Sequence, residues 1–157
     1  LTQGKFALVD DEDFEWLNQW KWCAYRSPYG AFYAVRAVCI GKTNRIIKMH
    51  RLIMDIIYKK DKQVDHINGD GTDNRRGNLR ICSHAENQRN RKMPKSNKSG
   101  YKGVYRIQEL WQARIKINGV QKYIGKFDAL EKAAKAYDKA AQKYHGEFAK
   151  LNFPLVQ

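Results

Sequence analysis

The sequence predicts an α+β protein of two small modules. The first is β-rich and leads into a strand–loop–strand–helix hairpin; the second is a separate three-stranded antiparallel sheet packed on one helix. Short runs of aromatic and β-branched residues, broken by Gly, Asn and Ser, recur before position 50 and after position 100. The segment 91–100 between them is basic and has hardly an apolar residue. Because small domains can fold at ~60 residues, we expect modules at 1–90 and 101–157, joined by a basic linker at 91–100.

The N-terminal module opens with a pattern of short strands separated by turns. We expect strands over 5–9, 21–25, 31–39 and 45–49, turns at 27–30 and 41–44, and a short helix over 13–19. Apolar residues at helical spacing predict a second helix over 50–58. A small sheet needs bulky side chains to bury enough area, so five aromatic residues are expected in the core. They are Trp16, Trp20, Trp22, Phe32 and Tyr33.

The central hairpin is predicted as a strand over 64–66, a polar loop, a strand over 79–82 and a helix that begins at Ser83. Ser83 and Glu86 have the spacing of a capping box, which puts Asn87 in the second turn of that helix. A hairpin of this kind would bring Asp65 and Asn87 face to face.

These residue types suit the hydrolysis of a phosphodiester bond. The carboxylate of Asp65 and the amide oxygen of Asn87 are hard ligands for one Mg²⁺ or Mn²⁺ ion, with positions left for water and phosphate. His66 can accept a proton from the attacking water, because an unperturbed imidazole titrates at ~6.5. Asn78 is expected to hold that imidazole at the correct tilt. Structural zinc is not expected, because the three cysteines form no Cys-x-x-Cys pair.

The other polar residues of this region are typical of structural rather than catalytic roles. Asn68-Gly69-Asp70-Gly71 is typical of a tight turn, and an EF-hand loop is excluded because Gly77 would stand where the bidentate Glu belongs. His84 and His145 are not expected to be catalytic, because the sequence offers neither a matching catalytic residue. For His50, packing or phosphate contact is favoured over catalysis.

The same hairpin resembles the HNH homing endonucleases, a family of ββα-metal nucleases. The resemblance rests on Asp65-His66, on Asn78 within RRGNLR, on Asn87 within HAENQRN and on His50-Arg51-Leu52, and it extends to the opening LTQGKFALVDDEDFEWL. Position 87 carries Asn rather than the His of stricter patterns. The resemblance implies a metal-dependent endonuclease that leaves a 5′-phosphate and a 3′-hydroxyl, often nicks one strand, and originates in a phage or mobile element.

The C-terminal module is predicted as strands over 102–107, 111–117 and 121–126 and a helix over 128–145. Asn118-Gly119 favours a tight hairpin turn, and Asp128 with Glu131 has capping-box spacing. In the middle strand apolar residues alternate with Gln112, Arg114 and Lys116, so one face is apolar and the other cationic. An alanine-rich helical stripe that stops at Gly146 would cover the apolar face.

This module resembles the plant ethylene-response-factor (APETALA-type) DNA-binding domain through YKGVYR, WQARIKING, YIGKFDALEKAAKAYDKAA and HGEFAKLNFP. The resemblance implies that the exposed face of the sheet reads the major groove. The positions it assigns to DNA contact are Lys102, Tyr105, Arg114, Lys116, Gln121 and Tyr123. Tyr105 and Tyr123 replace the usual Arg and Trp, so the plant target sequence does not transfer. In the linker, the cations Arg91 and Lys92 are expected to contact phosphate.

Charge points to the partner. The chain has 30 Lys and Arg residues against 16 Asp and Glu residues, a formal charge of +14, and the segment from Arg89 to Lys126 contains Glu109 as its single acid. The charge predicts a nucleic acid as partner, and the resemblance to the HNH homing endonucleases implies a homing-type endonuclease on double-stranded DNA, which we expect to act as a monomer. We expect no membrane and no small-molecule substrate, and a cytoplasmic location, near the nucleoid of a bacterium or in a phage-infected cell.

Two rival functions remain. One is a nonenzymatic DNA-binding regulator with a degenerate nuclease module, against which the intact set of Asp65, His66, Asn78 and Asn87 argues. The other is an RNA-binding protein, which would explain the charge but not that set.

Overall fold

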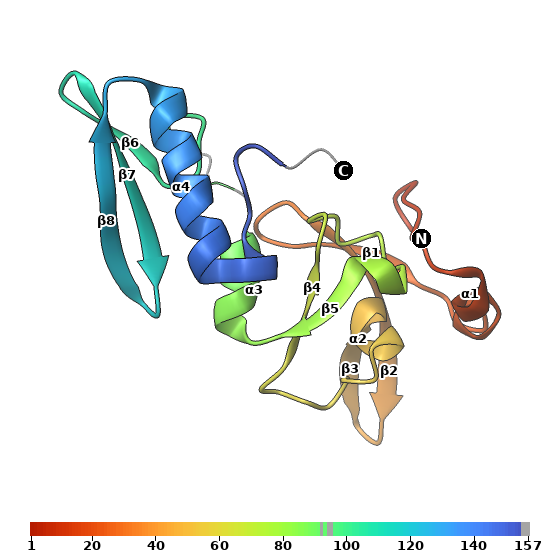
Figure 1. Cartoon of the computed structure of the whole chain (residues 1–157). Coiled ribbons are helices and arrows are strands. Elements are labelled where there is room, and N and C mark those ends of the chain that lie inside the picture. Colours follow the sequence, from red (N-terminus) through yellow and green to blue (C-terminus); the bar gives the residue numbers. More distant parts are fainter. Residues whose placement is uncertain (92, 94–95, 155–157) are drawn as a thin grey trace. The chain divides into compact units, whose positions relative to one another are not determined.

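The computed structural model describes residues 1–91, 93 and 96–154 and divides into two compact units, Leu1–Asn87 and Gln88–Gln157 (Figure 1). Each unit combines helices with antiparallel sheet: the first contains two small sheets and the second contains one. This composition confirms the α+β class. Lys92 lies outside the described residues, so its contact with DNA stays a prediction. Within the described part of the chain, no helix is long and apolar enough to cross a membrane.

The first unit begins with helix α1 (Asp11–Asn18) and a sheet of β1 (Cys23–Arg26), β2 (Phe32–Ile40) and β3 (Thr43–Lys48) in that order. The first turn of α1 is acidic and suits the positive end of the helix dipole, which explains why this helix starts before the predicted position 13. The turn predicted at 27–30 is confirmed: the amide of Gly30 donates to the carbonyl of Ser27 at 2.9 Å.

The strand predicted over 5–9 is wrong. Leu8 forms an isolated parallel bridge instead, in which its amide donates to the carbonyl of Thr72 at 2.9 Å and its carbonyl accepts from the amide of Asn74 at 2.7 Å. Phe6 and Leu8 are 81% and 51% exposed. Ala7 and Val9, which alternate with them, pack against the core of the unit, so the segment has one packed face although it forms a bridge rather than a strand.

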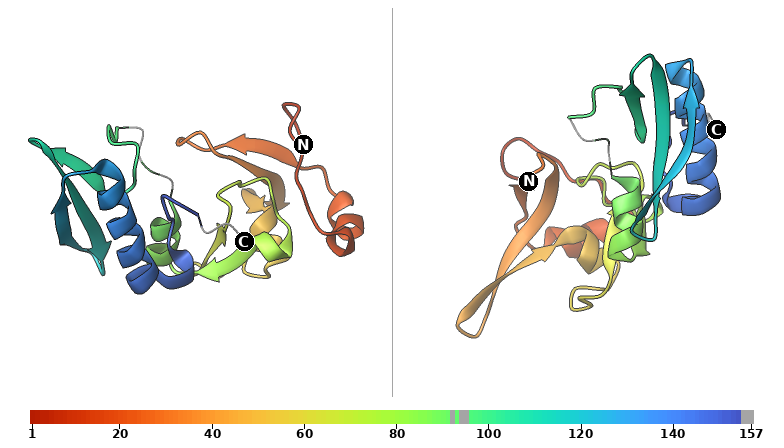
Figure 2. Two further views of the ribbon diagram at one scale, coloured as in Figure 1. Left: turned by 45° about the horizontal axis from the view of Figure 1, so that its top comes forward. Right: turned by 90° about the vertical axis from the view of Figure 1, so that its left-hand side faces the viewer.

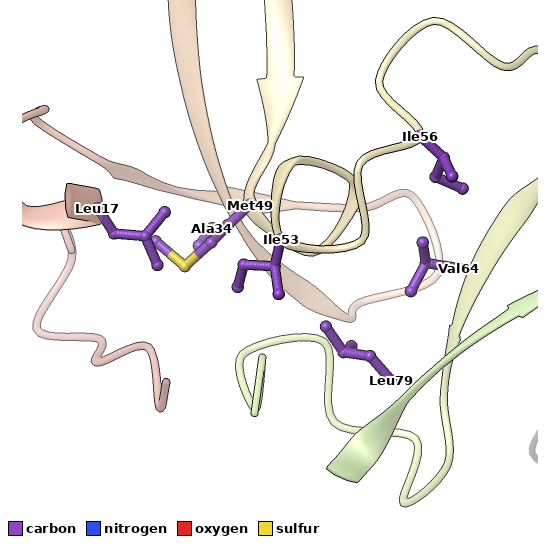
Figure 3. Packing of buried hydrophobic residues seen from close by; sticks show 7 residues of the cluster. All are labelled: Leu17, Ala34, Met49, Ile53, Ile56, Val64 and Leu79. Atoms are coloured by element: carbon purple, nitrogen blue, oxygen red, sulfur yellow. The ribbon is translucent and has the colours of Figure 1, made fainter. Parts of the chain in front are cut away.

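The core of the first unit is aliphatic rather than aromatic. Its buried cluster draws on α1, β2, α2, β4 and β5 (Figure 3) and consists of Leu17, Ala34, Met49, Ile53, Ile56, Val64 and Leu79. The five predicted core aromatics are only partly buried. Trp20 and Trp22, for example, flank the guanidinium of Arg36 at 4.1 and 5.7 Å from their ring centroids.

Helix α2 (Met49–Ile53) is shorter than the predicted 50–58. It ends where Asp55 adopts a left-handed φ of 49°. The following turns are held by the guanidinium of Arg51, which donates to the carbonyls of Ile56, Lys59 and Lys62 at 2.6, 2.7 and 2.8 Å. One arginine thus satisfies three backbone carbonyls of the irregular segment that follows α2.

The predicted hairpin is confirmed. Strands β4 (Gln63–His66) and β5 (Leu79–Cys82) pair antiparallel, a single turn η1 (Arg76–Asn78) precedes β5, and helix α3 (His84–Asn90) follows. The capping box forms as predicted, since Ser83 Oγ donates to Glu86 Oε2 at 2.7 Å and the amide of Glu86 donates to Ser83 Oγ at 3.3 Å. This box fixes where α3 begins.

The second unit contains the sheet β6 (Val104–Ile107), β7 (Leu110–Ile117) and β8 (Val120–Phe127), in that order, with helix α4 (Leu130–His145) along one face (Figure 2), then a turn η2 (Gly146–Phe148). Asn118 and Gly119 have φ of 49° and 83°, as a type I′ hairpin turn requires. The core consists of Val104, Ala113, Ile115, Ala133, Ala134, Tyr137 and Ala141.

The start of α4 and the entry into β6 each depend on a local contact that the sequence pattern did not indicate. The capping box predicted at Asp128 and Glu131 is wrong: α4 has no side-chain cap, and Asp128 Oδ2 accepts from Lys132 Nζ at 2.9 Å instead. Gly103 has φ +75°, and a Cβ there would collide with the ring of Tyr137, so glycine lets the chain enter β6 against α4.

Candidate active site

Buried polar side chains gather around the β4–β5 hairpin. His50, Asp65, His66 and Asn74 are at most 6% exposed. Burial of polar groups costs free energy unless they are hydrogen-bonded, so such a cluster indicates a built site rather than ordinary packing. The partners of each group show what the site can do.

His66, the last residue of β4, is held by a residue that the sequence did not suggest. Its Nε2 lies 3.4 Å from Asn74 Oδ1, and Asn74 Nδ2 donates to the carbonyl of Thr72 at 3.0 Å. Because Asn74 Oδ1 can only accept, Nε2 of His66 carries the hydrogen and Nδ1 is the basic nitrogen. Burial lowers the pKa of His66 below its usual value, although the Asn74 bond and the carboxylates of Asp65, Asp70 and Asp73 oppose the shift.

Three rings form one cluster at the site. The centroids of His50 and His66 are 4.8 Å apart, and the ring of Tyr33 lies 5.7 Å from His50 and 6.0 Å from His66. Burial, reinforced by the charges of His66, Lys48 and Arg51, lowers the pKa of His50 well below 6.5, so this imidazole is neutral. The packing role expected for His50 is thus the one that its geometry fits.

Tyr33 reaches the site because the polar loop between β4 and β5 lies close to β2. A Cβ at Gly71 would collide with the Tyr33 ring and with the carbonyl of Phe32, so glycine permits this approach. Tyr33 was expected only in the core; alternation along a strand cannot tell a core ring from a ring that borders a site.

Asn78 does not hold the imidazole, contrary to expectation. Its Nδ2 donates to Asn68 Oδ1 at 3.1 Å and to the carbonyl of Asp73 at 2.8 Å, while its Oδ1 accepts from the amide of Asn68 at 3.0 Å. Asn78 therefore fastens the polar loop across the hairpin. Asn74, inside that loop, is the residue that contacts His66.

Asp65 is paired with a cation across the hairpin. Arg80 stands opposite Asp65 in the strand register, and its Nε and Nη2 donate to Asp65 Oδ2 at 3.0 and 2.7 Å. Both side chains are largely buried. Arg80 was not among the predicted site residues, although antiparallel pairing of the predicted strands 64–66 and 79–82 places it opposite Asp65.

Asn87 is joined to β4 through a second missed residue, Gln63. Asn87 Nδ2 donates to Gln63 Oε1 at 2.6 Å, and Gln63 Nε2 lies 3.0 Å from His84 Nδ1. Gln63 precedes Asp65 by two positions, so their side chains share one face of the strand. Asp65 and Asn87 are thus both tied to that face of β4, rather than joined directly.

The side chains of this site that could bind a metal ion, Asp65 and Asn87, are hard oxygen ligands. Among residues 1–91, 93 and 96–154, no group of three or more His, Cys, Asp and Glu side chains gathers as a metal site. A carboxylate from Asp65 and an amide oxygen from Asn87 fit a cation that keeps several water or phosphate ligands, as Mg²⁺ does. The neighbouring Cys82 thiol is no ligand for it, since burial raises its pKa to about 11.

The second unit presents a separate polar surface, the outer face of its sheet. By strand register this face carries Tyr105, Gln112, Arg114, Lys116, Gln121 and Tyr123, opposite the apolar face under α4. Tyr105 and Tyr123 are 48% and 60% exposed. Arg114 Nε donates to Gln112 Oε1 at 2.7 Å, which orients the guanidinium over this face.

Lys102 is not on the outer face, although it was expected among the DNA contacts. It precedes β6, and its Nζ donates to the backbone carbonyls of Arg89 and Arg91. Burial, together with the charges of Lys150 and Arg91, lowers its pKa to about 8. Arg91, which was expected to contact phosphate together with Lys92, is exposed.

Known proteins are similar to this chain over different parts of its length. A family model described as HNH endonuclease matches residues 48–89, which contain His50, Asp65, His66, Asn78 and Asn87. An HNH endonuclease of Acanthamoeba polyphaga mimivirus is 31% identical over 155 residues, 96% of this chain and 76% of that protein. Protein 3.8 of Escherichia phage T7 is 36% identical over 94 residues, 59% of this chain and 77% of that protein.

A plant relative matches the C-terminal part. APETALA2-like protein 2 of Oryza sativa subsp. indica is 43% identical over 70 residues, which are 43% of this chain and 16% of that protein. The similarity to this relative is therefore confined to a segment the size of a small domain.

Proposed function

The chain belongs to the HNH endonuclease family, and on that premise we propose that it hydrolyses phosphodiester bonds of duplex DNA at the site around His66. The observation that carries the proposal is the buried contact between His66 and Asn74, with Asp65 next to His66 on β4. It combines a neutral imidazole, whose basic nitrogen is fixed, with a carboxylate suited to a divalent cation. These are the two components that metal-assisted hydrolysis needs.

Asp65 and Asn87 would hold one divalent ion, Mg²⁺ or Mn²⁺, through a carboxylate and an amide oxygen. When bound, it would supply stabilisation of the charge that develops on the phosphoryl oxygens and on the departing 3′ oxygen. Arg80 limits how the Asp65 carboxylate can turn, because it holds Oδ2 with two donors. A bound ion would therefore share the Asp65 carboxylate with the guanidinium of Arg80.

The proton transfer belongs to His66. Its Nδ1 takes a proton from water as the water oxygen attacks phosphorus, and the bond from phosphorus to the 3′ oxygen breaks. The leaving oxygen takes a proton from solvent, so the products carry a 5′-phosphate and a 3′-hydroxyl. Before the transfer, Asn74 holds the neutral ring in the tautomer that leaves Nδ1 basic, because its Oδ1 accepts from Nε2.

The outer face of the second unit is proposed to bind the duplex. Its two exposed tyrosines and two cations project from a sheet that α4 covers on the other side. Arg and Lys suit phosphates and guanine edges, and a rigid sheet can present them to a major groove. We propose that this surface makes the cleavage sequence-directed, as in a homing-type nuclease of phage or mobile-element origin that nicks its target.

A plasmid-nicking assay tests the proposal. Supercoiled plasmid should become open-circular with the full chain and Mg²⁺ or Mn²⁺, remain supercoiled in EDTA, and remain supercoiled with His66→Ala. Competition with duplex RNA should affect DNA binding little. If the parental protein binds duplex DNA yet never nicks plasmid with either ion, the nonenzymatic DNA-binding alternative replaces the proposal.

A further inference from the structure

We propose that Gln63 is a positioning residue that decides which end of the Asn87 amide faces the metal. The inference rests on the proposed function, because it concerns the same two-ligand site. Gln63, the first residue of β4, connects the hairpin to α3: its Oε1 accepts from Asn87 Nδ2 at 2.6 Å, and its Nε2 lies 3.0 Å from His84 Nδ1.

The chemistry of an amide makes this contact decisive for metal binding. An Asn side chain carries one oxygen and one NH₂ group on opposite sides of its terminal carbon. The oxygen is a hard ligand, whereas the NH₂ group has no lone pair to offer and would present hydrogens to the cation. Because Gln63 Oε1 can only accept, it holds Nδ2 and leaves Oδ1 of Asn87 turned away from Gln63 and free to face a cation.

His84 in turn fixes the orientation of Gln63. In the geometry found, Gln63 Nε2 donates to His84 Nδ1, which requires the hydrogen of the neutral His84 ring on Nε2. The reversed arrangement would put a hydrogen on His84 Nδ1, turn Gln63 Oε1 toward it, and leave Gln63 Nε2 to donate to Asn87 Oδ1. The metal ligand would then be lost, so one tautomer of His84 corresponds to the competent site.

The fold supports this arrangement on both sides. His84 and Asn87 are three residues apart on α3, so they share one face of that helix. The capping box of Ser83 and Glu86 fixes where the helix begins. Gln63 and Asp65 share one face of β4, so a single strand face carries one ligand and the group that orients the other.

Direct metal binding tests the inference. Mn²⁺ affinity of the full chain, measured by electron paramagnetic resonance without DNA, should fall about tenfold in Gln63→Leu, within the range found when groups that orient a ligand are removed. Gln63→Glu should stay close to the parental affinity, because its carboxylate still accepts from Asn87 Nδ2. Gln19→Leu, an exposed glutamine at the end of α1, is the matched control and should change nothing. Thermal melting in EDTA reports whether each variant folds.

The outcomes separate this inference from the proposed function. If Asn87→Ala and Asp65→Ala both bind Mn²⁺ like the parent, the metal site itself is wrong and Gln63 has nothing to position. If those variants lose affinity while folded Gln63→Leu does not, or if Gln63→Glu is as weak as Gln63→Leu, the positioning role of Gln63 is overturned.

A second measurement needs no variant of Gln63. The ¹⁵N shifts of His84 in the parental protein report its tautomer, and an unprotonated Nδ1 is expected. A protonated Nδ1 in the neutral ring would correspond to the reversed amide and would overturn the inference even if Gln63→Leu failed to fold.

Discussion

The side chains proposed to act on DNA differ in burial between the two units. In the first, His50, Asp65, His66 and Asn74 are buried beside the aliphatic core. In the second, the core includes four alanines, and the cations Arg114 and Lys116 lie exposed on the outer face of the sheet. Small alanine side chains let α4 pack closely on one face of the sheet, which leaves the other face free.

The difference corresponds to two kinds of task. Proton transfer needs a group with one tautomer and one orientation, and a buried network such as Thr72–Asn74–His66 supplies both. Contact with a large polyanion needs exposed cations on a rigid support, and burial would prevent it. Removing a polar group should therefore affect chemistry or stability in the first unit and affinity in the second.

His66→Ala should have the largest effect. Loss of a general base typically lowers the rate by ~10²–10⁴, while duplex affinity should stay nearly unchanged because the imidazole acts on water. The measurement is single-turnover nicking at saturating Mg²⁺, beside a gel-shift titration. His145→Ala is the histidine control in the second unit and should nick at the parental rate; parental nicking by His66→Ala would remove His66 from the mechanism.

Arg80→Ala should have the next largest effect, on stability. It leaves the carboxylate of Asp65 buried without its cation, and breaking a buried pair costs about 3–5 kcal/mol. Arg106→Ala in the second unit removes a partner from the Arg106–Glu109 pair, whose side chains are 61% and 93% exposed. An exposed pair of that kind contributes about 0–1 kcal/mol.

Urea denaturation in EDTA measures the free energy of unfolding of both arginine variants, and a second titration is made with Mg²⁺ in place of EDTA. Mg²⁺ should recover part of the loss in Arg80→Ala, because the ion replaces a positive charge beside Asp65. Equal losses in the two variants would mean that Asp65 is not effectively buried, and the contrast between the units would not hold at this position.

Replacing Arg114 and Lys116 together with Ala should weaken duplex binding by the second unit. If both contact phosphates, the slope of log K against log salt should fall by roughly two units; if both contact bases, discrimination against a scrambled duplex should fall by ~1–3 kcal/mol per contact. Lys139 and Lys143, both exposed on α4, form the matched double variant that removes the same charge. Equal weakening in the two variants would mean that total charge, not the outer face, determines affinity.

The sequence predicted the parts that depend on local patterns. Alternation along 111–117, the Asn118-Gly119 turn and the Ser83–Glu86 spacing each predicted an element that the structure contains. The errors arose where contacts outside the local pattern matter. Asp55 adopts a left-handed φ after α2, and Arg51 binds the carbonyls of the turns that follow. Leu8 forms its bridge with Asp73, in the loop between β4 and β5.

The same distinction applies to the site. Residue types and spacing suggested Asp65, His66 and Asn87, because their chemistry is visible in the sequence. The residues that orient them were assigned wrongly or missed: Asn74 rather than Asn78 contacts His66, and Gln63 contacts Asn87. Orientation depends on which amide of a loop rich in Asn and Asp comes closest, and spacing does not determine that.

Lys102 should show the smallest effect, as a dependence of stability on pH. Its pKa is about 8 in the folded protein against 10.5 for an ordinary lysine, mainly because of burial. Between those values the unfolded chain binds more protons than the folded one, so the free energy of unfolding should rise with pH across this window. At pH 8 and below, the cost of burying the charged form is fully present, and above 10.5 it is gone.

Lys102→Met removes this titration. It also removes the hydrogen bonds to the carbonyls of Arg89 and Arg91, but that loss changes little with pH. The difference in unfolding free energy between the parent and Lys102→Met should therefore grow from pH 7 to pH 10 in favour of the parent. Lys139→Met, at an exposed position on α4, should show no such trend. Parallel curves for the parent and Lys102→Met would mean that Lys102 titrates like an exposed lysine, and its absence from the outer face would then need another explanation than burial against the linker.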